Sequence, residues 1–153
     1  MMDTIQLQNI CKTFDQHPVF INWNQNFKTG MVHVLKGSSG CGKTTLLRML
    51  MGLEIPDSGT ITPLQNYRKA AVFQEDRLCE NLSAMQNVLM VVNNQSKKDL
   101  LDQLKQDFYQ VGLDDMFQKV STLSGGMKRR VAILRAMYAN ADILFFDEPL
   151  KGL

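Results

Sequence analysis

The chain has 153 residues, which is the length of one domain and enough to bury a hydrophobic core. Hydrophobic residues make up 44% and charged residues 21%, a balance that excludes the low hydrophobicity and high net charge of disordered chains. The formal net charge of +2 provides no strongly basic surface for nucleic acid or an anionic membrane, so no nucleic acid partner is expected.

The three cysteines, Cys11, Cys41 and Cys79, are odd in number and form no CxxC pair. They argue against a disulfide framework or a zinc site and favour a reducing cytoplasm. The first ten residues lack the basic and apolar stretches of a signal peptide. The longest apolar runs, 88–92 and 143–146, are far shorter than the roughly 20 residues that span a bilayer. Any role at a membrane is therefore expected to come through a partner.

Apolar and polar residues alternate near the N-terminus, which predicts antiparallel strands with one buried face, followed by a turn at 28–30. The apolar positions are Ile5, Leu7, Val19, Ile21, Trp23 and Phe27. The run Val32 to Leu35 predicts a parallel strand covered on both faces. Residues 43–51 predict a buried helix that ends at Gly52.

Farther along the chain, residues 56–59 predict a turn and residues 70–73 a strand. Residues 82–111 follow a helical pattern, and its lysines are expected on a solvated surface. A second helix is predicted at 127–139 and a last apolar strand at 143–146. The apolar face of the first helical pattern carries Leu100, Leu101, Leu104, Phe108 and Val111.

The segment between the predicted strand and helix fits the phosphate-binding pattern GxxxxGK(S/T) in full. Its glycines let the backbone N–H groups face phosphate oxygens, and the following helix adds the positive end of its dipole. Lys43 is expected to reach the β- and γ-phosphates, and the Thr44 hydroxyl to hold Mg²⁺. The nucleotide-binding residues assigned here are Gly37, Ser38, Ser39, Gly40, Cys41, Gly42, Lys43, Thr44 and Thr45.

Two further segments suit a nucleotide site. Asp147 and Glu148 end the last apolar strand, where one acid can hold magnesium and the next can activate water, although such a pair is also common in a solvated turn. Ser124 suits an ordinary helix N-cap. Because Gly125 and Gly126 would weaken an ordinary helix, they make better sense where a phosphate approaches the backbone.

These segments together resemble the ATP-binding subunit of ATP-binding-cassette (ABC) transporters. Four motifs stand in the family's order: the P-loop at 37–44, the Q-loop at 73–77, the signature at 123–127 and the Walker B strand with its acidic end at 143–149. The resemblance implies an α/β P-loop NTPase (ABC ATPase) core with an N-terminal antiparallel β subdomain and a small inserted helical subdomain. The chain is then one domain, with its core at approximately 1–74 and 120–153 and the helical subdomain at 75–119.

The resemblance also implies roles for individual residues. Gln74 contacts Mg²⁺ or the attacking water, and Glu148 is the catalytic base; Lys43 completes the catalytic set. The implied Mg²⁺ residues are Thr44, Gln74 and Asp147. Phe14 falls where the family stacks an aromatic ring on adenine, with a core aromatic as the alternative. Ser124, Gly125 and Gly126 touch the ATP of a second subunit in a head-to-tail dimer.

The implied function is ATP hydrolysis that energises solute import, on the cytoplasmic face of the cell membrane. The implied partners are a second ATP-binding subunit, transmembrane permease subunits and an extracytoplasmic solute-binding protein. The sequences QEDRL, SGGMKRRVAI and DEPLKGL are similar to those of importers of the nitrate, sulfonate and taurine type. The solute itself is chosen by other subunits in such systems.

Two departures from the family pattern leave alternatives open. Met127 replaces the signature glutamine and cannot make its amide hydrogen bonds. Family members continue well beyond Leu153, with an aspartate, a further strand and a histidine that contacts the γ-phosphate. The chain is therefore expected to be either a fragment of a longer gene product or a C-terminally truncated protein. The alternatives to a transport ATPase are a nucleotide-binding module without turnover and a non-transport ABC ATPase.

Overall fold

The computed structural model describes residues 4–92 and 97–149, without the side chains of residues 97–99. The chain forms two compact units, Met1–Tyr67 and Arg68–Leu153, and each is described by itself. The predicted division into a core and an inserted helical subdomain stays a prediction.

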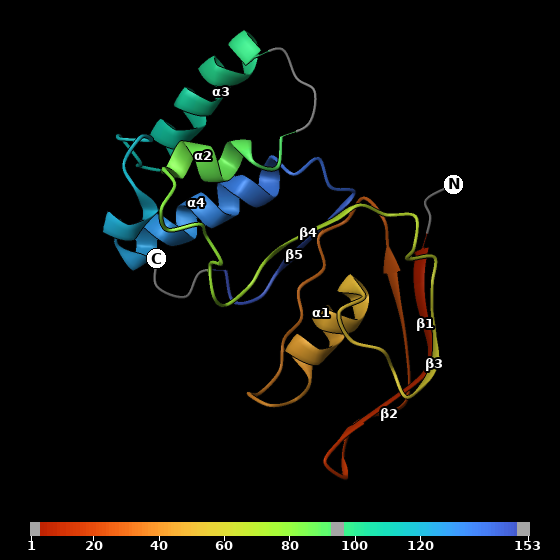
Figure 1. Ribbon diagram of the computed structural model, residues 1–153. Coiled ribbons are helices and arrows are strands. Elements are labelled where there is room, and N and C mark those ends of the chain that lie inside the picture. The colour runs from red at the N-terminus through yellow and green to blue at the C-terminus, as the bar shows by residue number, and fades with distance from the viewer. Residues whose placement is uncertain (1–3, 93–96, 150–153) are drawn as a thin grey trace. The chain divides into compact units, whose positions relative to one another are not determined.

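The first unit is built on an antiparallel sheet with the strand order β2-β1-β3 (Figure 1). Its strands are β1 (Thr4–Phe14), β2 (His17–Lys28) and β3 (Ser58–Thr62). This sheet confirms the antiparallel strands predicted near the N-terminus. Helix α1 (Lys43–Met51) has the predicted bounds. It ends at Gly52, whose left-handed φ of 77° lets its N–H donate to the carbonyls of the last turn.

A bulge in β1 changes which side chains face the core. Ile5 and Leu7 are buried, and two residues later Asn9 takes a left-handed φ of 53°. The pairing register with β2 shifts between Leu7 and Ile10, so the buried positions move to Ile10 and Lys12. The Oδ1 of Asn24 accepts a hydrogen bond from the Asn9 N–H at 2.9 Å.

A similar change in β2 makes one prediction wrong. Asn22 has a left-handed φ of 46°, and the alternation breaks there. Ile21, predicted on the buried face, is 69% exposed. Phe20 instead shares a face with Trp23, and their ring centroids are 5.2 Å apart.

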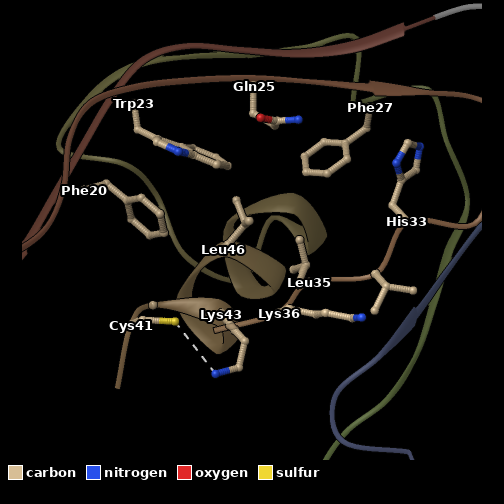
Figure 2. A pocket seen from close by; sticks show the side chains of 12 residues that line it. Phe20, Trp23, Gln25, Phe27, His33, Leu35, Lys36, Cys41, Lys43 and Leu46 are labelled. Carbon is tan, nitrogen blue, oxygen red and sulfur yellow. Dashed lines mark hydrogen bonds between the residues drawn. The ribbon is translucent and has the colours of Figure 1, made fainter. Parts of the chain in front are cut away.

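That face of β2 lines a cavity of about 400 Å³ beside the start of α1 (Figure 2). Phe20, Trp23 and Phe27 line it on the strand side and Leu46 on the helix side. His33 also lines it, and its ring meets Phe27 edge to face with centroids 5.1 Å apart.

The predicted parallel strand at Val32 to Leu35 is wrong for this structure. These residues form no strand, and Val32 and Val34 are 91% and 72% exposed. A parallel strand needs a neighbour that accepts and donates its backbone hydrogen bonds. Within the described part of the first unit the sheet contains only β2, β1 and β3, so the run has no sheet neighbour there.

The second unit contains a parallel strand pair, β4 (Lys69–Val72) and β5 (Ile143–Phe146), and both strands match predicted ones. Their register pairs Lys69 with Ile143 and Val72 with Phe146. At the start of the pair, Arg68 Nη2 donates to Asp142 Oδ1 at 2.8 Å. Since parallel strands run in one direction, the ends of β4 and β5 meet at one edge.

Three helices and a short 3₁₀ turn accompany these strands. They are α2 (Ala84–Leu89), α3 (Lys97–Gln110), η1 (Val120–Thr122) and α4 (Gly125–Met137). The single helical pattern predicted over 82–111 is thus two helices, and residues 93–96 between them lie outside the described residues. Helix α4 starts two residues before the predicted helix and ends two residues earlier. Among the described helices, none has the length and apolar character needed to cross a membrane.

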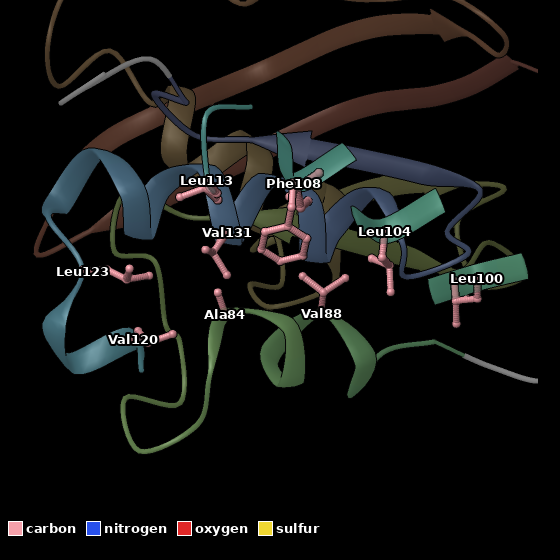
Figure 3. Packing of buried hydrophobic residues seen from close by; sticks show 10 residues of the cluster. Ala84, Val88, Leu100, Leu104, Phe108, Leu113, Val120, Leu123 and Val131 are labelled. Carbon is pink, nitrogen blue, oxygen red and sulfur yellow. The ribbon is translucent and has the colours of Figure 1, made fainter. Parts of the chain in front are cut away.

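The helices of the second unit pack around a large hydrophobic cluster (Figure 3). The predicted apolar face of α3 is confirmed, because Leu100, Leu104 and Phe108 are buried there and Leu101 and Val111 are partly buried. The other buried members of the cluster are Ala84, Val88, Leu113, Val120, Leu123, Val131 and Leu134.

Gly59 in β3 should tolerate no side chain. Its φ is +94°, and a Cβ would lie 2.5 Å from the carbonyl oxygens of Gln8 and Asn9 at the β1 bulge. We expect Gly59→Ala to lower the free energy of unfolding by more than about 2 kcal/mol, measured by urea denaturation. The matched control is Gly30→Ala, which has a φ of +72° but open space around its Cβ and should cost about 1 kcal/mol. Equal losses would contradict the steric argument.

Asp142 should contribute an acid-sensitive part of the stability. Hydrogen bonds from the side chain and backbone of Arg68 lower the pKa of Asp142 from 3.8 to about 2. A carboxylate whose pKa is lower in the folded state stabilises the fold above its unfolded pKa, and this contribution disappears as the pH falls toward the folded pKa. Asp142→Asn should therefore lower the free energy of unfolding at pH 7. It should also make the free energy of unfolding fall less steeply between about pH 4 and pH 2. Denaturation curves at several pH values test this; Asp102→Asn, in an exposed ion pair, is the control and should leave the pH dependence unchanged.

Candidate nucleotide site

The phosphate loop precedes α1 and turns through two left-handed glycines. Gly40 has a φ of 79° and Gly42 a φ of 93°. Gly42 is the N-cap of α1, and its carbonyl accepts a hydrogen bond from the Leu46 N–H at 2.8 Å. The first turn of α1 contains no acidic residue, so the positive end of the helix is not neutralised within that turn.

Gly42 is required by packing as well as by conformation. A Cβ at this position would lie 2.6 Å from Val19 Cγ1 and 3.0 Å from Phe20 Cζ, both on β2. The first distance is shorter than real Cβ contacts and the second is tight, so a side chain at 42 would displace the loop or the side chains of Val19 and Phe20. The close approach of the loop to β2 therefore fixes where the loop enters α1.

Lys43 folds back over the loop. Its Nζ donates to the carbonyls of Gly37 at 2.9 Å and Ser38 at 2.7 Å, and lies 3.8 Å from the Cys41 Sγ, as Figure 2 shows for the sulfur. Within the described residues Lys43 forms no ion pair with a carboxylate. An ammonium held by neutral carbonyls is available to an anion that offers stronger hydrogen bonds.

Phe14 lies at the end of β1, where it pairs with His17 across the hairpin. Its side chain is 41% exposed, so it is not the core aromatic that was the alternative interpretation. The Lys12 Nζ lies 5.0 Å from the centroid of the ring, within cation–π range, and is held at 2.7 Å by Glu54. The predicted role of Phe14 in stacking on adenine stays a prediction.

In the second unit, the ends of β4 and β5 bring two predicted site residues together. Gln74 follows β4, and its Nε2 donates to Glu148 Oε2 at 3.4 Å. The Asp147 N–H extends the strand pairing to the Val72 carbonyl at 2.9 Å. Glu148 is exposed and takes a left-handed φ of 50°, an unfavourable conformation for a residue with a Cβ. Strain of this kind is concentrated at functional sites.

The signature segment forms the start of α4. Ser124 is the N-cap, and its Oγ accepts a hydrogen bond from the Met127 N–H at 3.3 Å, as its residue type predicts. Gly125 is exposed, and a Cβ there would meet no atom within 4 Å. Packing within the described residues therefore does not require a glycine at 125. The departure at Met127 has a structural reason, since its side chain packs against the hydrophobic cluster of this unit.

Sequence reasoning missed Arg129, which the structure places next to these residues. It lies in the basic run 128–130, and such runs are ordinarily solvated helix surfaces. Arg129 is instead only 3% exposed, and its guanidinium donates to the backbone around Gln74 and Glu148. The helical spacing could have indicated that Arg129 is buried. Ala132, three residues later, is buried, and Ile133, four residues later, is partly buried, so all three lie on one face of α4.

Comparison with known proteins finds similarity to one family. The sequence profile of the ABC transporter family matches residues 20–151. The spermidine/putrescine import ATP-binding protein PotA of Mesoplasma florum is 36% identical over 97% of this chain and 46% of its own length. The Fe(3+) ions import ATP-binding protein FbpC 1 of Rhizobium meliloti is 34% identical over 98% of this chain and 46% of its own length.

A solved structure described as an inward-facing conformation of a metal-chelate type ABC transporter covers 100% of this chain and 62% of its own. Its TM-score is 0.77 at 24% identity, which confirms the predicted fold class. The chain spans about half the length of the curated relatives that it matches. Because the matched profile includes the phosphate loop, the Gln74 segment, the signature and the acidic end of β5, the chain belongs to the ABC transporter family.

Proposed function

We propose that this chain binds Mg·ATP and hydrolyses it, as part of an ATP-binding subunit that energises solute import by an ABC transporter. The observation that carries the proposal is the phosphate loop at the start of α1, with Gly42 in a left-handed conformation and Lys43 above the loop. The curated relatives described above are import ATP-binding proteins, which supports import as the direction of transport.

The residues of the loop fit a triphosphate. Left-handed glycines at 40 and 42 let the backbone curl before a helix N-terminus, and that arrangement favours anions. A phosphate oxygen would replace the neutral carbonyls of Gly37 and Ser38 as the acceptor for Lys43, with a stronger charge-assisted hydrogen bond. We assign the triphosphate to residues 37–45 and adenine to Phe14.

We assign the chemistry to the residues at the ends of β4 and β5. Mg²⁺ would neutralise phosphate charge when bound, and Thr44, Gln74 and Asp147 are the oxygen-bearing side chains assigned to it. Glu148 would accept a proton from the attacking water, and its hydrogen bond with Gln74 supports a shared task at that water.

The partners are proposed from the family. A second ATP-binding subunit would present its own phosphate to Ser124, Gly125 and Gly126, and the open space around Gly125 supports a close approach. Transmembrane permease subunits and an extracytoplasmic solute-binding protein would complete the importer, with this subunit on the cytoplasmic face of the membrane. The narrower similarity to nitrate, sulfonate and taurine importers stays a prediction.

Calorimetric titration with Mg·ATP and a phosphate-release assay test the proposal together. Lys43→Ala should weaken Mg·ATP binding at least tenfold, because it removes charged hydrogen bonds, whereas the neighbouring Lys36→Ala should change it by less than about twofold. Glu148→Gln should retain binding and abolish turnover. Binding without turnover in the parent chain would support a nucleotide-binding module instead. Absence of binding would contradict the proposal.

Cys41 offers an independent test of the loop. Its thiol is exposed and a Cβ at Gly37 would lie only 2.6 Å from its sulfur, so an added group would crowd the loop. Alkylation of Cys41 should abolish Mg·ATP binding, and Mg·ATP should slow the alkylation, as followed by mass spectrometry. A Cys41→Ser variant, with Cys11 and Cys79 still present, is the control and should bind after the same treatment. Alkylation at an unchanged rate with saturating Mg·ATP would argue against a nucleotide at this loop.

Gly125→Ala should lower turnover without lowering the stability of the fold. A Cβ at 125 meets open space, and alanine favours the helix, so the free energy of unfolding should stay the same or rise by up to about 1 kcal/mol. Turnover should fall, because the methyl group would occupy the space assigned to the partner's phosphate. Parallel urea denaturation and phosphate-release measurements check this pair of outcomes. Unchanged turnover would remove Gly125 from the assigned site.

A further inference from the structure

We propose that Arg129 is a positioning residue for ATP hydrolysis, which holds Glu148 in its left-handed conformation and fixes the segment that carries Gln74. The expected effect on catalysis rests on the proposed function. The arrangement itself is independent of that function, because every contact lies within the second unit.

Arg129 is a buried cation that uses its whole guanidinium group. Its side chain is 3% exposed, and an arginine offers five N–H donors. Its nitrogens make five hydrogen bonds, through Nε, Nη1 and Nη2, and four of the five acceptors are backbone carbonyls. The remaining acceptor, Asp76 Oδ1 at 3.1 Å, supplies the carboxylate partner. A buried arginine is stable only with such partners.

Three of these bonds gather successive carbonyls after β5. Nη2 donates to Asp147 O at 3.1 Å and to Glu148 O at 2.6 Å, and Nε donates to Pro149 O at 3.1 Å. Successive carbonyls of an extended strand point in alternate directions, so they cannot all face one cation. The left-handed φ of 50° at Glu148 is the turn that lets them do so. Arg129 thereby stabilises a backbone conformation of Glu148 that is otherwise unfavourable.

The other two bonds hold the segment after β4. Nη1 donates to the Phe73 carbonyl and to Asp76 Oδ1, which lie on either side of Gln74 in the sequence. Between these fixed points the Gln74 side chain reaches Glu148. One cation thus sets the backbone on both sides of the Gln74–Glu148 hydrogen bond, and the direction of each side chain depends on it.

Arg129→Lys tests the proposal, because lysine keeps the charge but has three donors on one nitrogen and cannot reproduce the fork. We expect the backbone amide signals of Gln74 and Glu148 to shift in the ¹⁵N–¹H spectrum of the chain, while core signals such as Val131 and Leu134 show that the unit is folded. We expect kcat to fall by about tenfold to a hundredfold, with KM for ATP unchanged.

Arg68→Lys is the matched control in the same unit. Arg68 binds Asp142 at the opposite end of β5, so its signal changes should be confined to the start of that strand and kcat should be unchanged. If Arg129→Lys does not fold, Asp76→Asn replaces it: loss of the carboxylate from Arg129 should still shift the Glu148 amide signal.

Parent-like Gln74 and Glu148 signals in folded Arg129→Lys would overturn the proposal, and so would an unchanged kcat. In the Asp76→Asn experiment, an unshifted Glu148 signal would overturn it. If the parent chain hydrolyses no ATP, the proposed function fails, and the amide signals alone still decide whether Arg129 holds Glu148.

Discussion

The absence of a side chain at Gly42 is the constraint on which the proposed nucleotide site depends. The loop must pass close to Val19 and Phe20 of β2, and at the same residue the backbone must turn left-handed to open α1. A residue with a Cβ would be strained in this conformation and would crowd Val19. Lys43 follows at once as the first residue of the helix, so the same turn that brings the helix terminus to the loop also brings the ammonium over it. We therefore propose that local backbone geometry forms the anion site before any ligand binds.

The second unit positions its proposed catalytic residues in another way, through strand direction and one buried cation. Parallel pairing of β4 and β5 brings Gln74 and Glu148 to the same edge of the sheet. Strand pairing alone does not fix the conformation of the two loops that carry them. Helix α4 supplies the fixing group, because Arg129 points from its buried face into both loops. Ser124 caps the same helix and Gly125 begins it, so the signature segment and Arg129 belong to one helix.

The sequence predicted elements whose pattern is local and missed features that depend on neighbours. Helix α1 and strand β5 were predicted with their observed bounds, because a glycine loop and a short apolar run define their ends. The bulges at Asn9 and Asn22 were not foreseen, since asparagine signals a left-handed turn only weakly, and Ile21 was therefore placed on the wrong face. The run from Val32 has the composition of a strand, yet composition cannot supply a sheet neighbour. Arg129 was missed because burial of a charge is decided by tertiary partners.

The most direct test of the central claim, that the glycine loop binds the phosphates of ATP, is a titration of the ¹⁵N-labelled chain with Mg·ATP, followed by the backbone amide signals. We expect the largest shifts on residues 40–45, with smaller shifts at Phe14, and we expect that excess inorganic phosphate does not reproduce the full pattern. Largest shifts at Trp23, Phe27 and His33 would place the ligand in the aromatic cavity instead, and no shift at saturating Mg·ATP would contradict binding altogether.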